Sequence, residues 1–424
     1  MTNKFLQLKA LKRIIDDLQP FQVVLEHIER SKNLSSDDIM IFRSNVLGSL
    51  RHFSYLQFEA ITAFPEFDRD DDEIYLMILA LYEIRYHSKD VALYKVIDQV
   101  LETIDYMELR LDKEVVSEKL KYLAKNKTKI PNELKSDPCA YNSLFFNTPE
   151  WIIKMWINDF GDDQAMNILL ANQRRANQYL CCNSLKCNKD DFQDDQRFIE
   201  TENGEGALEY RGGSFSKLNE VKEGKLFAMD LSAQIMVDNL KYFEQQKILY
   251  IGEEFSSTVC GVGVSSKDYN VEIDALLLDE MIFARTKNLA KRLGIDNIKP
   301  FLGGVDLMLT YSEYANYDLV LLNPLSSCLG QVRRRPDVLV TLSEKEVNYY
   351  GRSDFKKLME SSKFVCPGGY LVYFVPTLTS IETSNVINKF LSSNSNFCME
   401  YSRMIFPNEY SSDGFYFAIL RRNS

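Results

Sequence analysis

From residue 236 onward the sequence alternates between short apolar runs and helical patterns, and this alternation constrains the fold more than any other feature. Strands are predicted at 248–251, 275–278, 300–302, 318–322, 370–375 and 415–420. Helical patterns lie between several of these strands, at 281–293, 353–365 and 382–391. Such alternation predicts a parallel, doubly wound α/β sheet with a ligand site at the carboxyl ends of its strands.

The first 128 residues show helical periodicity only. Apolar side chains recur at spacings of three and four residues, and the pattern breaks at 33–38 and 64–72. An all-helical domain is therefore predicted for residues 1–128. The polar segment that follows contains Pro131 and Pro138 and is predicted to be a linker.

Residues 140–235 predict a small α+β middle domain. A helix is expected to begin at Thr148-Pro149, with Thr148 as its N-cap and Pro149 at its first position. Short strands follow at 179–182, 208–211 and 226–228, and the acidic segment 190–205 is predicted to be a solvated loop. With 424 residues the chain is too long for one core, which favours a third domain at 236–424.

Composition excludes several classes of protein. The formal net charge is −11 at pH 7, whereas tight nucleic-acid binders gather positive potential against phosphates. A chain covered in RNA is not expected, although a local basic patch is compatible with this balance. No run of eighteen apolar residues occurs, and charges are spaced through the N-terminus, so we expect neither a signal peptide nor a membrane span. The predicted location is the cytoplasm.

The positions of histidine and cysteine limit the chemistry. Only three histidines occur, all within the first hundred residues, so no Ser/His or Cys/His triad is expected in the C-terminal half. The cysteines form no CxxC pair, and the cluster of Cys181, Cys182 and Cys187 lacks both a nearby histidine and the spacing of a zinc site. We expect small buried hydrophobic residues there and no metal.

The segment after the predicted strand 318–322 concentrates reactive residue types. Asn323-Pro324 is followed by two serines, by Cys328 and by three adjacent arginines, Arg333, Arg334 and Arg335. In a doubly wound sheet this segment begins at the ligand edge. The arginines form a local basic patch, and phosphate contact, a helix start and a salt-bridge role all stay open on the sequence.

Several stretches resemble, in order and at matching spacing, the motifs of one enzyme family. They are Thr148-Pro-Glu-Trp-Ile-Ile-Lys, Phe160-Gly-Asp-Asp-Gln-Ala, Lys291-Arg-Leu-Gly-Ile, Leu329-Gly-Gln-Val-Arg-Arg-Arg-Pro-Asp and Pro367-Gly-Gly-Tyr-Leu-Val-Tyr. The chain resembles the RNA cytosine-5 methyltransferases of the Nop/Sun type, especially the bacterial enzymes for small-subunit rRNA. The resemblance implies a NusB-like helical domain at 1–128, the family's middle domain at 140–235 and a Rossmann-like domain at 236–424 that binds S-adenosyl-L-methionine (SAM).

The resemblance also implies catalytic positions, and this chain departs from each of them. In the family a cysteine thiolate adds to carbon 6 of cytosine so that carbon 5 accepts the methyl group, and a second cysteine assists release. In this chain Ser326 replaces the second cysteine, and Asn323 replaces the aspartate of the same family loop. Pro376 replaces the nucleophilic cysteine. No family catalytic residue is intact. Cys328 falls at a family glycine and is interpreted as a passive cysteine rather than a displaced catalytic thiol.

The cofactor loop that the resemblance implies is altered as well. The family uses glycines between the first strand and helix so that backbone amides approach SAM. Here Gly252 is followed by two carboxylates, Glu253 and Glu254, and Ser256-Ser257 replaces the glycine pair. Gly252 and Asn323 remain as candidate cofactor contacts, and SAM binding is expected to be impaired.

Alternative cofactor contacts stay open on the sequence. The position that would hold the SAM ribose reads Leu277, and Asp274 or Asp279 takes that place if the register differs. Gly261-Val-Gly263 is a candidate for a shifted glycine loop. None of these features selects one register over the other.

These departures predict a pseudoenzyme that keeps the binding of RNA or ribosome precursors without methyl transfer. Its expected partner is small-subunit rRNA, contacted through the three arginines. One alternative is an active RNA methyltransferase by an altered route, at cytosine-5 or at a base amino group. Asn323-Pro324 favours the amino route because it matches the start of the Asn-Pro-Pro-aromatic loop of amino methyltransferases. Another alternative is a protein-interaction module, which the acidic balance and the helical domain would suit.

Overall fold

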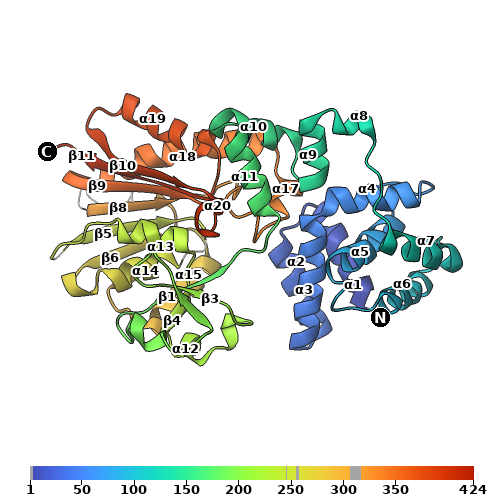
Figure 1. Ribbon diagram of the computed structural model, residues 1–424. Helices are drawn as coiled ribbons and strands as arrows, with labels where there is room; N and C mark the ends of the chain where they lie inside the picture. The colour runs from blue at the N-terminus through green and yellow to red at the C-terminus, as the bar shows by residue number, and fades with distance from the viewer. Residues whose placement is uncertain (1–2, 245, 255–256, 306–316) are drawn as a thin grey trace. The chain divides into compact units, whose positions relative to one another are not determined.

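The computed structural model describes residues 3–244, 246–254, 257–305 and 317–424, which form two compact units (Figure 1). The helical unit comprises Met1–Arg174 and Val332–Leu342, and the sheet unit comprises Arg175–Gln331 and Ser343–Ser424. The chain therefore leaves the sheet unit at Val332 and returns to it at Ser343. The finer division at 128, 140 and 235 stays a prediction.

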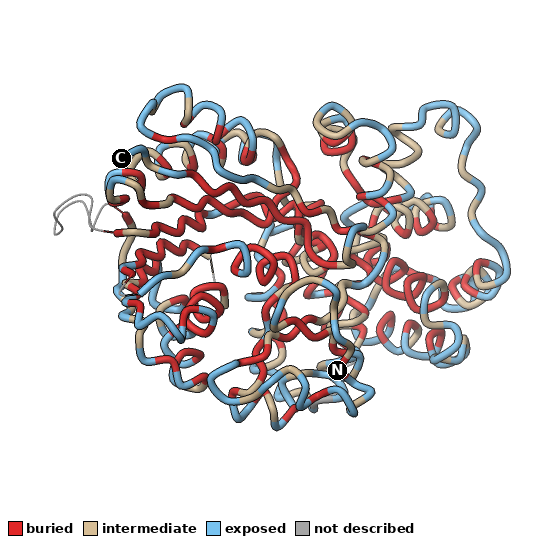
Figure 2. The backbone as a smooth tube through the Cα atoms, turned by 60° about the vertical axis from the view of Figure 1, so that its left-hand side comes forward, coloured by how far each residue is buried: buried red, intermediate tan, exposed pale blue. Residues whose placement is uncertain are grey.

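The helical unit is built around one helix that is buried on all sides. Its helices are α1 (Asn3–Ile15), α2 (Phe21–Lys32), α3 (Ser36–Arg51), α4 (Phe53–Ala63), α5 (Asp72–Tyr86), α6 (Leu93–Met107), α7 (Lys113–Lys125), α8 (Asn132–Lys135), α9 (Pro138–Phe146), α10 (Glu150–Phe160), α11 (Asp162–Asn172) and α17 (Val338–Thr341). Helix α5 contacts α1, α3, α4, α6 and α7 and is buried continuously from Glu73 to Ile84. A helix that is buried on all sides belongs inside a core. Figure 2 shows the buried stretches of the chain in red and the exposed turns and loops in pale blue. The prediction that residues 1–128 are all-helical is confirmed, since α1 to α7 lie in this range.

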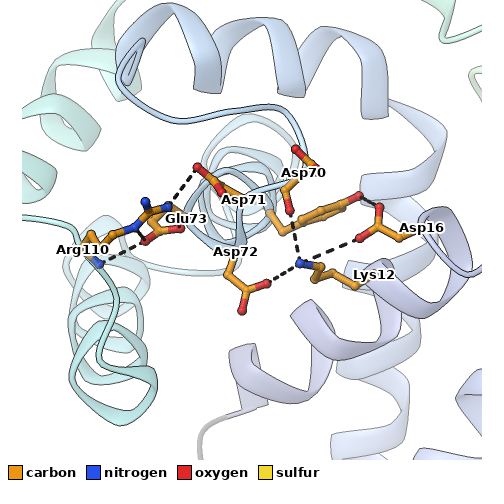
Figure 3. Close-up of polar contacts among 8 residues, drawn as sticks. Lys12, Asp16, Asp70, Asp71, Asp72, Glu73 and Arg110 are labelled. Carbon is orange, nitrogen blue, oxygen red and sulfur yellow. Dashed lines mark hydrogen bonds and ion pairs between the residues drawn. The ribbon is translucent and has the colours of Figure 1, made fainter.

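Polar contacts fix the start of α5 at the surface of this unit (Figure 3). Lys12 of α1 lies 2.7 Å from Asp72 and 3.9 Å from Asp16. On the other side, Arg110 lies 3.0 Å from Asp71 and 3.1 Å from Glu73. Carboxylates in a first helical turn are also favoured by the helix dipole. The acidic run before α5 is thus structural, and its ion pairs with Lys12 and Arg110 join the start of α5 to neighbouring segments.

The sheet unit contains a seven-stranded sheet in the order β10-β11-β9-β8-β5-β6-β7. These strands are β5 (Lys247–Gly252), β6 (Glu272–Leu277), β7 (Ile298–Leu302), β8 (Tyr317–Asn323), β9 (Val365–Val375), β10 (Phe397–Ile405) and β11 (Phe415–Arg422). Every strand predicted after residue 236 is present, and the predicted Rossmann-like α/β fold class is confirmed. The prediction of a wholly parallel sheet is wrong, because β11 runs antiparallel to both β9 and β10.

Helices cover both faces of this sheet and create two cores. Along β5, Leu249 and Ile251 pack on one face with α18 (Glu344–Ser361) and α19 (Ser384–Ser393). The alternate residues, Ile248 and Tyr250, face the other core. That core contains side chains of α13 (Leu231–Asp238), α14 (Thr258–Ser265) and α15 (Glu280–Leu293) (Figure 1). Burial on both faces explains why the parallel strands read as continuous apolar runs.

A second, antiparallel sheet has the order β2-β3-β1-β4. Its strands are β1 (Gln178–Cys182), β2 (Phe198–Glu200), β3 (Ala207–Tyr210) and β4 (Leu226–Ala228), with the short helix α12 (Asn219–Lys222) before β4. Strand β2 lies in the acidic segment that was expected to be only a loop, so that prediction is wrong there. Phe198 is buried and pairs with Tyr210, which supplies the apolar anchor that the surrounding charges concealed.

Two smaller findings complete the fold. Helix α10 begins at Glu150 with Pro149 as its N-cap, so Thr148 does not cap it as predicted; the Thr148 hydroxyl donates to the Phe146 carbonyl instead. Among the described residues, no helix combines the length and apolar character needed to cross a bilayer.

Candidate functional site

The carboxyl edge of the seven-stranded sheet gathers the family-equivalent positions. Gly252 ends β5 and is the register partner of Asn323, which ends β8. Pro376 directly follows β9, the next strand in the sheet. Parallel strands place their carboxyl ends together. The structure therefore brings Gly252, Asn323, Ser326 and Pro376 to one edge, where the chain would carry out chemistry on a ligand.

Asn323 is buried at this edge and already engaged on both its side chain and its main chain. The side-chain amide donates to the Phe374 carbonyl at 3.2 Å. The main-chain carbonyl accepts a hydrogen bond from Glu253 N–H at 2.9 Å. Asn323 thus joins three neighbouring strand ends rather than presenting its amide to a ligand.

Glu253 turns its carboxylate inward onto the loop after β8. The side chain is 7% exposed. Its Oε2 accepts a hydrogen bond from Leu325 N–H at 3.2 Å and forms an ion pair with Lys357 of α18. A paired and hydrogen-bonded carboxylate of this kind is costly to disrupt. The first of the two unexpected carboxylates is therefore a fixed part of the edge.

Glu254 occupies the next donors of the same loop. Its Oε1 accepts hydrogen bonds from the Ser326 N–H and hydroxyl, each at 3.3 Å, and lies 3.4 Å from the Cys328 sulfur. Backbone amides at such a loop are the groups that would receive an anionic ligand. Here the chain's own carboxylates occupy them.

Cys328 lies in this arrangement without the surroundings of a nucleophile. It is buried and has φ = 56°, a left-handed conformation that favours glycine, which agrees with its place at a family glycine. Reactive cysteines lie beside cationic groups or helix N-termini. The Cys328 thiol instead lies beside the Glu254 carboxylate and 3.7 Å from the Ser326 hydroxyl.

A buried carboxyl group anchors the middle of the loop. Glu382, in the 3-10 helix after β9, accepts hydrogen bonds from Ser327 N–H at 2.7 Å and the Ser327 hydroxyl at 2.6 Å. The Thr377 hydroxyl donates to the same carboxyl at 3.2 Å. Burial raises the pKa of Glu382 to about 7, although the hydrogen bonds from Ser327 act in the opposite direction. The network joins the loops after β8 and β9.

A second buried carboxyl group lies behind it. The Tyr373 hydroxyl contacts Asp354 Oδ2 at 2.8 Å and the Glu382 carbonyl at 2.6 Å. Burial raises the pKa of Asp354 to about 8, although the hydrogen bond from Tyr373 lowers it. Desolvation, which disfavours the charged carboxylate, is the main cause of this raised pKa.

Pro376 has a structural place at this edge. Its carbonyl accepts the Gly330 N–H at 3.1 Å, and the Gly330 carbonyl accepts the Gly414 N–H at 2.7 Å. A proline side chain has no nucleophilic atom, so thiol addition cannot proceed from this position.

The residues at this edge do not fit SAM in the way that the family holds it. Gly252 faces the Tyr250 ring, and a Cβ there would lie 2.4 Å from a ring carbon, so this glycine is explained by packing. Glu253 and Glu254 stand in the loop after β5, where the family has small residues, and their carboxylates accept from Leu325 and Ser326 N–H of the loop after β8. Their negative charge would repel the carboxylate of SAM. Ser256 lies outside the described residues.

Of the alternative cofactor contacts, one lies at the carboxyl edge of the sheet and the others do not offer a free side chain or loop there. Leu277 is buried, and Asp274 accepts a hydrogen bond from the Tyr317 hydroxyl within the sheet. Asp279 does reach the carboxyl edge, where it caps α15 through Ile282 N–H at 2.8 Å. The proposed shifted glycine loop is wrong: Gly261 and Gly263 lie inside α14, and a Cβ on Gly261 would meet the Met229 sulfur at 2.8 Å.

The three arginines lie in the helical unit. Arg333 is 4% exposed, its carbonyl accepts a hydrogen bond from Arg51 at 2.8 Å, and its Nε lies 3.4 Å from the Arg174 carbonyl. Arg334 and Arg335 are half-buried, and α17, which follows, contacts α1. Arg333 thus helps to attach the segment Val332–Leu342 to the helical unit. RNA contact by the three arginines stays a prediction.

Sequence reasoning missed Lys357, Asp354 and Glu382. Lys357 and Asp354 lie in the predicted helix 353–365, and nothing in the sequence points to partners so distant along the chain. Glu253 and Glu254 did give a signal, since two carboxylates replaced small residues. The cysteine cluster places the Cys182 and Cys187 sulfurs 3.1 Å apart, and no group of metal ligands occurs in the described part of the chain.

Comparisons with known proteins agree with this architecture. Residues 270–421 match the family model described as 16S rRNA methyltransferase RsmB/F. The probable ribosomal RNA small subunit methyltransferase B of Coxiella burnetii is 21% identical over 404 residues, covering 89% of this chain and 90% of the relative. The corresponding Bacillus subtilis protein is 22% identical, covering 68% and 69% of the two chains.

Solved structures show the same fold. The crystal structure of PH0851 superposes with a TM-score of 0.79 at 17% identity, covering 100% of this chain and 99% of the other. NSun6 from Pyrococcus horikoshii, solved with SFG, gives a TM-score of 0.59 at 14% identity, covering 65% of this chain and 98% of the other. The resemblance predicted from the motifs is thus confirmed: residues 270–421 match the RsmB/F methyltransferase model, and the chain is similar to the small-subunit rRNA methyltransferases B over most of its length.

Proposed function

We propose that this chain is a member of the small-subunit rRNA cytosine-5 methyltransferase family that binds RNA or ribosome precursors without transferring a methyl group. The observation that carries the proposal is the closed carboxyl edge, where Glu253 and Glu254 occupy the donors of the loop after β8. Ser326 and Pro376, in the two family cysteine positions, add the loss of the thiols. Relative to the family, both the cofactor loop and the position of the nucleophile are therefore altered in this chain.

The domain functions follow from this proposal. Residues 1–128 act as a NusB-like domain, 140–235 as the family's middle domain and 236–424 as a Rossmann-like scaffold without cofactor. Small-subunit rRNA is the proposed partner, because relatives that cover most of the chain carry that substrate in their names.

Nothing at the site favours the amino methyltransferase alternative. That chemistry needs an Asn amide and a Pro carbonyl directed at the target amine. The Asn323 amide donates to the Phe374 carbonyl, and Leu325-Ser326 supplies neither a second proline nor an aromatic ring. The protein-interaction module differs from our proposal in one measurable property, which is salt-dependent affinity for RNA.

Two assays on the purified full chain test the proposal. With labelled SAM and unmodified small-subunit rRNA, we expect no label in the RNA, while methyltransferase B of Proteus mirabilis serves as positive control. In a binding assay, we expect rRNA affinity that falls as salt rises. Label transfer would overturn the loss of catalysis, and the absence of RNA binding would favour the interaction module.

A further inference from the structure

Figure 1 shows the segment that connects α7 and α8. Its residues line two cavities of the helical unit. One has a volume of about 790 Å³ and the other about 450 Å³, and both are lined by Lys127, Thr128 and Lys129. Because they share these three residues, we treat them as one surface, the lysine groove. The groove lies within a single compact unit.

The backbone beside the groove is fixed rather than loose. Arg85 donates to the Leu123 carbonyl at 2.7 Å and to the Asn126 carbonyl at 2.9 Å. Thr128 N–H donates to Glu59 Oε1 at 3.1 Å, and Glu59 is itself paired with Arg85. A buried ion pair therefore positions the segment that carries the lysines, so little ordering is needed before a ligand binds.

Positive charge is concentrated here, against the balance of the whole chain. The larger cavity is lined by four lysines, Lys119, Lys125, Lys127 and Lys129, against one carboxylate, Glu118, although the chain carries a net charge of −11. Lys125, Lys127, Lys129 and Lys135 are exposed, and none has an acidic partner within the described ranges. Free ammonium groups on a concave surface attract phosphates and release counterions when phosphates bind.

Aromatic rings stand among these cations. Tyr122 lines the larger cavity and is 65% exposed; Tyr86 and Phe145 line the smaller one and are 47% and 46% exposed. Phe145 stacks on Tyr141 with ring centroids 5.9 Å apart and an interplanar angle of 10°. Tyr86 stacks on His52 at 4.1 Å and 10°. The rings are thus held by neighbours while much of their surface stays open to solvent.

Lysines that follow a fixed backbone, interleaved with exposed rings, match single-stranded nucleic acid. Unpaired bases stack on aromatic side chains, which contributes about 1–3 kcal/mol per base, while ammonium groups contact the phosphates. An acidic peptide would use the lysines but has no need of the rings. We infer that the lysine groove binds a single-stranded RNA segment; that the nucleic acid is RNA rests on the proposed function.

The test compares charge reversal inside and outside the groove, on the full chain. The groove variant is K125E/K127E/K129E, and the control K32E/K89E/K95E reverses three exposed lysines of the same unit with the same change in net charge. Affinity is measured by fluorescence anisotropy with a labelled single-stranded RNA of about twelve nucleotides. We expect the groove variant to bind RNA at least about tenfold more weakly than wild type. The slope of log affinity against log salt concentration should become shallower by about 2, and the control should stay near wild type in both quantities.

A second pair separates stacking from charge. Tyr122→Ala is expected to weaken binding by about fivefold or more, whereas Tyr122→Phe keeps the ring and the affinity. Unchanged thermal melts would show that the variants fold. If the wild-type chain binds RNA and the groove and control variants bind it equally well, the groove inference fails while the proposed function stands. If the wild-type chain bound no RNA, the proposed function would fail and the groove with it.

Discussion

The carboxyl edge of the sheet and the lysine groove treat charge in opposite ways. At the edge, Glu253 and Glu254 turn inward and are met by backbone donors and by Lys357. In the groove, Lys125, Lys127 and Lys129 point their charge into solvent. Among the described residues, Glu253 and Glu254 occupy the Leu325 and Ser326 donors at the edge, whereas the cations and rings of the groove are exposed to solvent. This contrast is what our proposal requires, in which methyl transfer is lost and RNA binding is kept.

The largest expected effect is a loss of stability when the buried carboxyl group of Glu382 is removed. Glu382→Ala removes the acceptor of the Ser327 N–H and hydroxyl in a fully buried place. Unpaired buried donors should lower the free energy of unfolding by about 3 kcal/mol, measured by urea denaturation. Glu382→Gln keeps one acceptor oxygen and should cost less than half as much at pH 6. Equal losses for both variants would contradict the loop-anchoring role.

The edge should also make stability depend on pH. Asp354 has an ordinary pKa of 3.8 and a folded-state pKa of about 8, so its contribution is complete below about pH 4 and is lost as pH rises toward 8. Through Asp354 alone, the free energy of unfolding should fall by roughly 2–3 kcal/mol from pH 5.5 to 8. Glu382, whose pKa burial raises to about 7, adds to this fall in the same direction. Asp354→Asn should therefore make the slope shallower without abolishing it, and an unchanged slope in that variant would contradict the assignment.

A smaller effect separates the arginines from the groove. Arg333→Ala should destabilise the helical unit by about 1–2 kcal/mol, because the buried side chain packs where Val332–Leu342 joins that unit. It should leave RNA affinity within about twofold, unlike the groove variant. A loss of RNA affinity without a loss of stability would instead support phosphate contact by this arginine.

For the last variant we expect no change in methyl transfer. Ser326→Cys combined with Pro376→Cys restores cysteine to both family positions, yet we expect no transfer of label from SAM to small-subunit rRNA. The carboxylates of Glu253 and Glu254 would still occupy the loop donors. Methyl transfer by this double variant would show that only the thiols were missing and that the edge admits the cofactor.

Much of the fold followed from periodicity, and the failures have physical reasons. The parallel strands were found because burial on both faces makes them continuously apolar. Strand β10 was missed because residues 398–402 are exposed at the sheet edge and carry no apolar alternation. Helix α18 begins at Glu344, earlier than predicted, although the Ser343–Glu346 capping box that starts it was visible in the sequence.

The site was less predictable than the fold. Its replaced positions could be read from the motifs, and Glu253 and Glu254 were visible as misplaced carboxylates. Their partners Leu325 and Lys357 lie 72 and 104 residues further along the chain, so only the folded sheet brings them together. The burial of Arg333 was equally hidden, since a run of three arginines gives no sign that one of them lies inside.

Calorimetric titration of SAM into the purified wild-type chain tests the central claim most directly. If Glu253 and Glu254 close the carboxyl edge, the titration should give no saturable heat up to millimolar SAM. A saturable isotherm with a Kd in the micromolar range would contradict the closed edge and return the chain to the active methyltransferases.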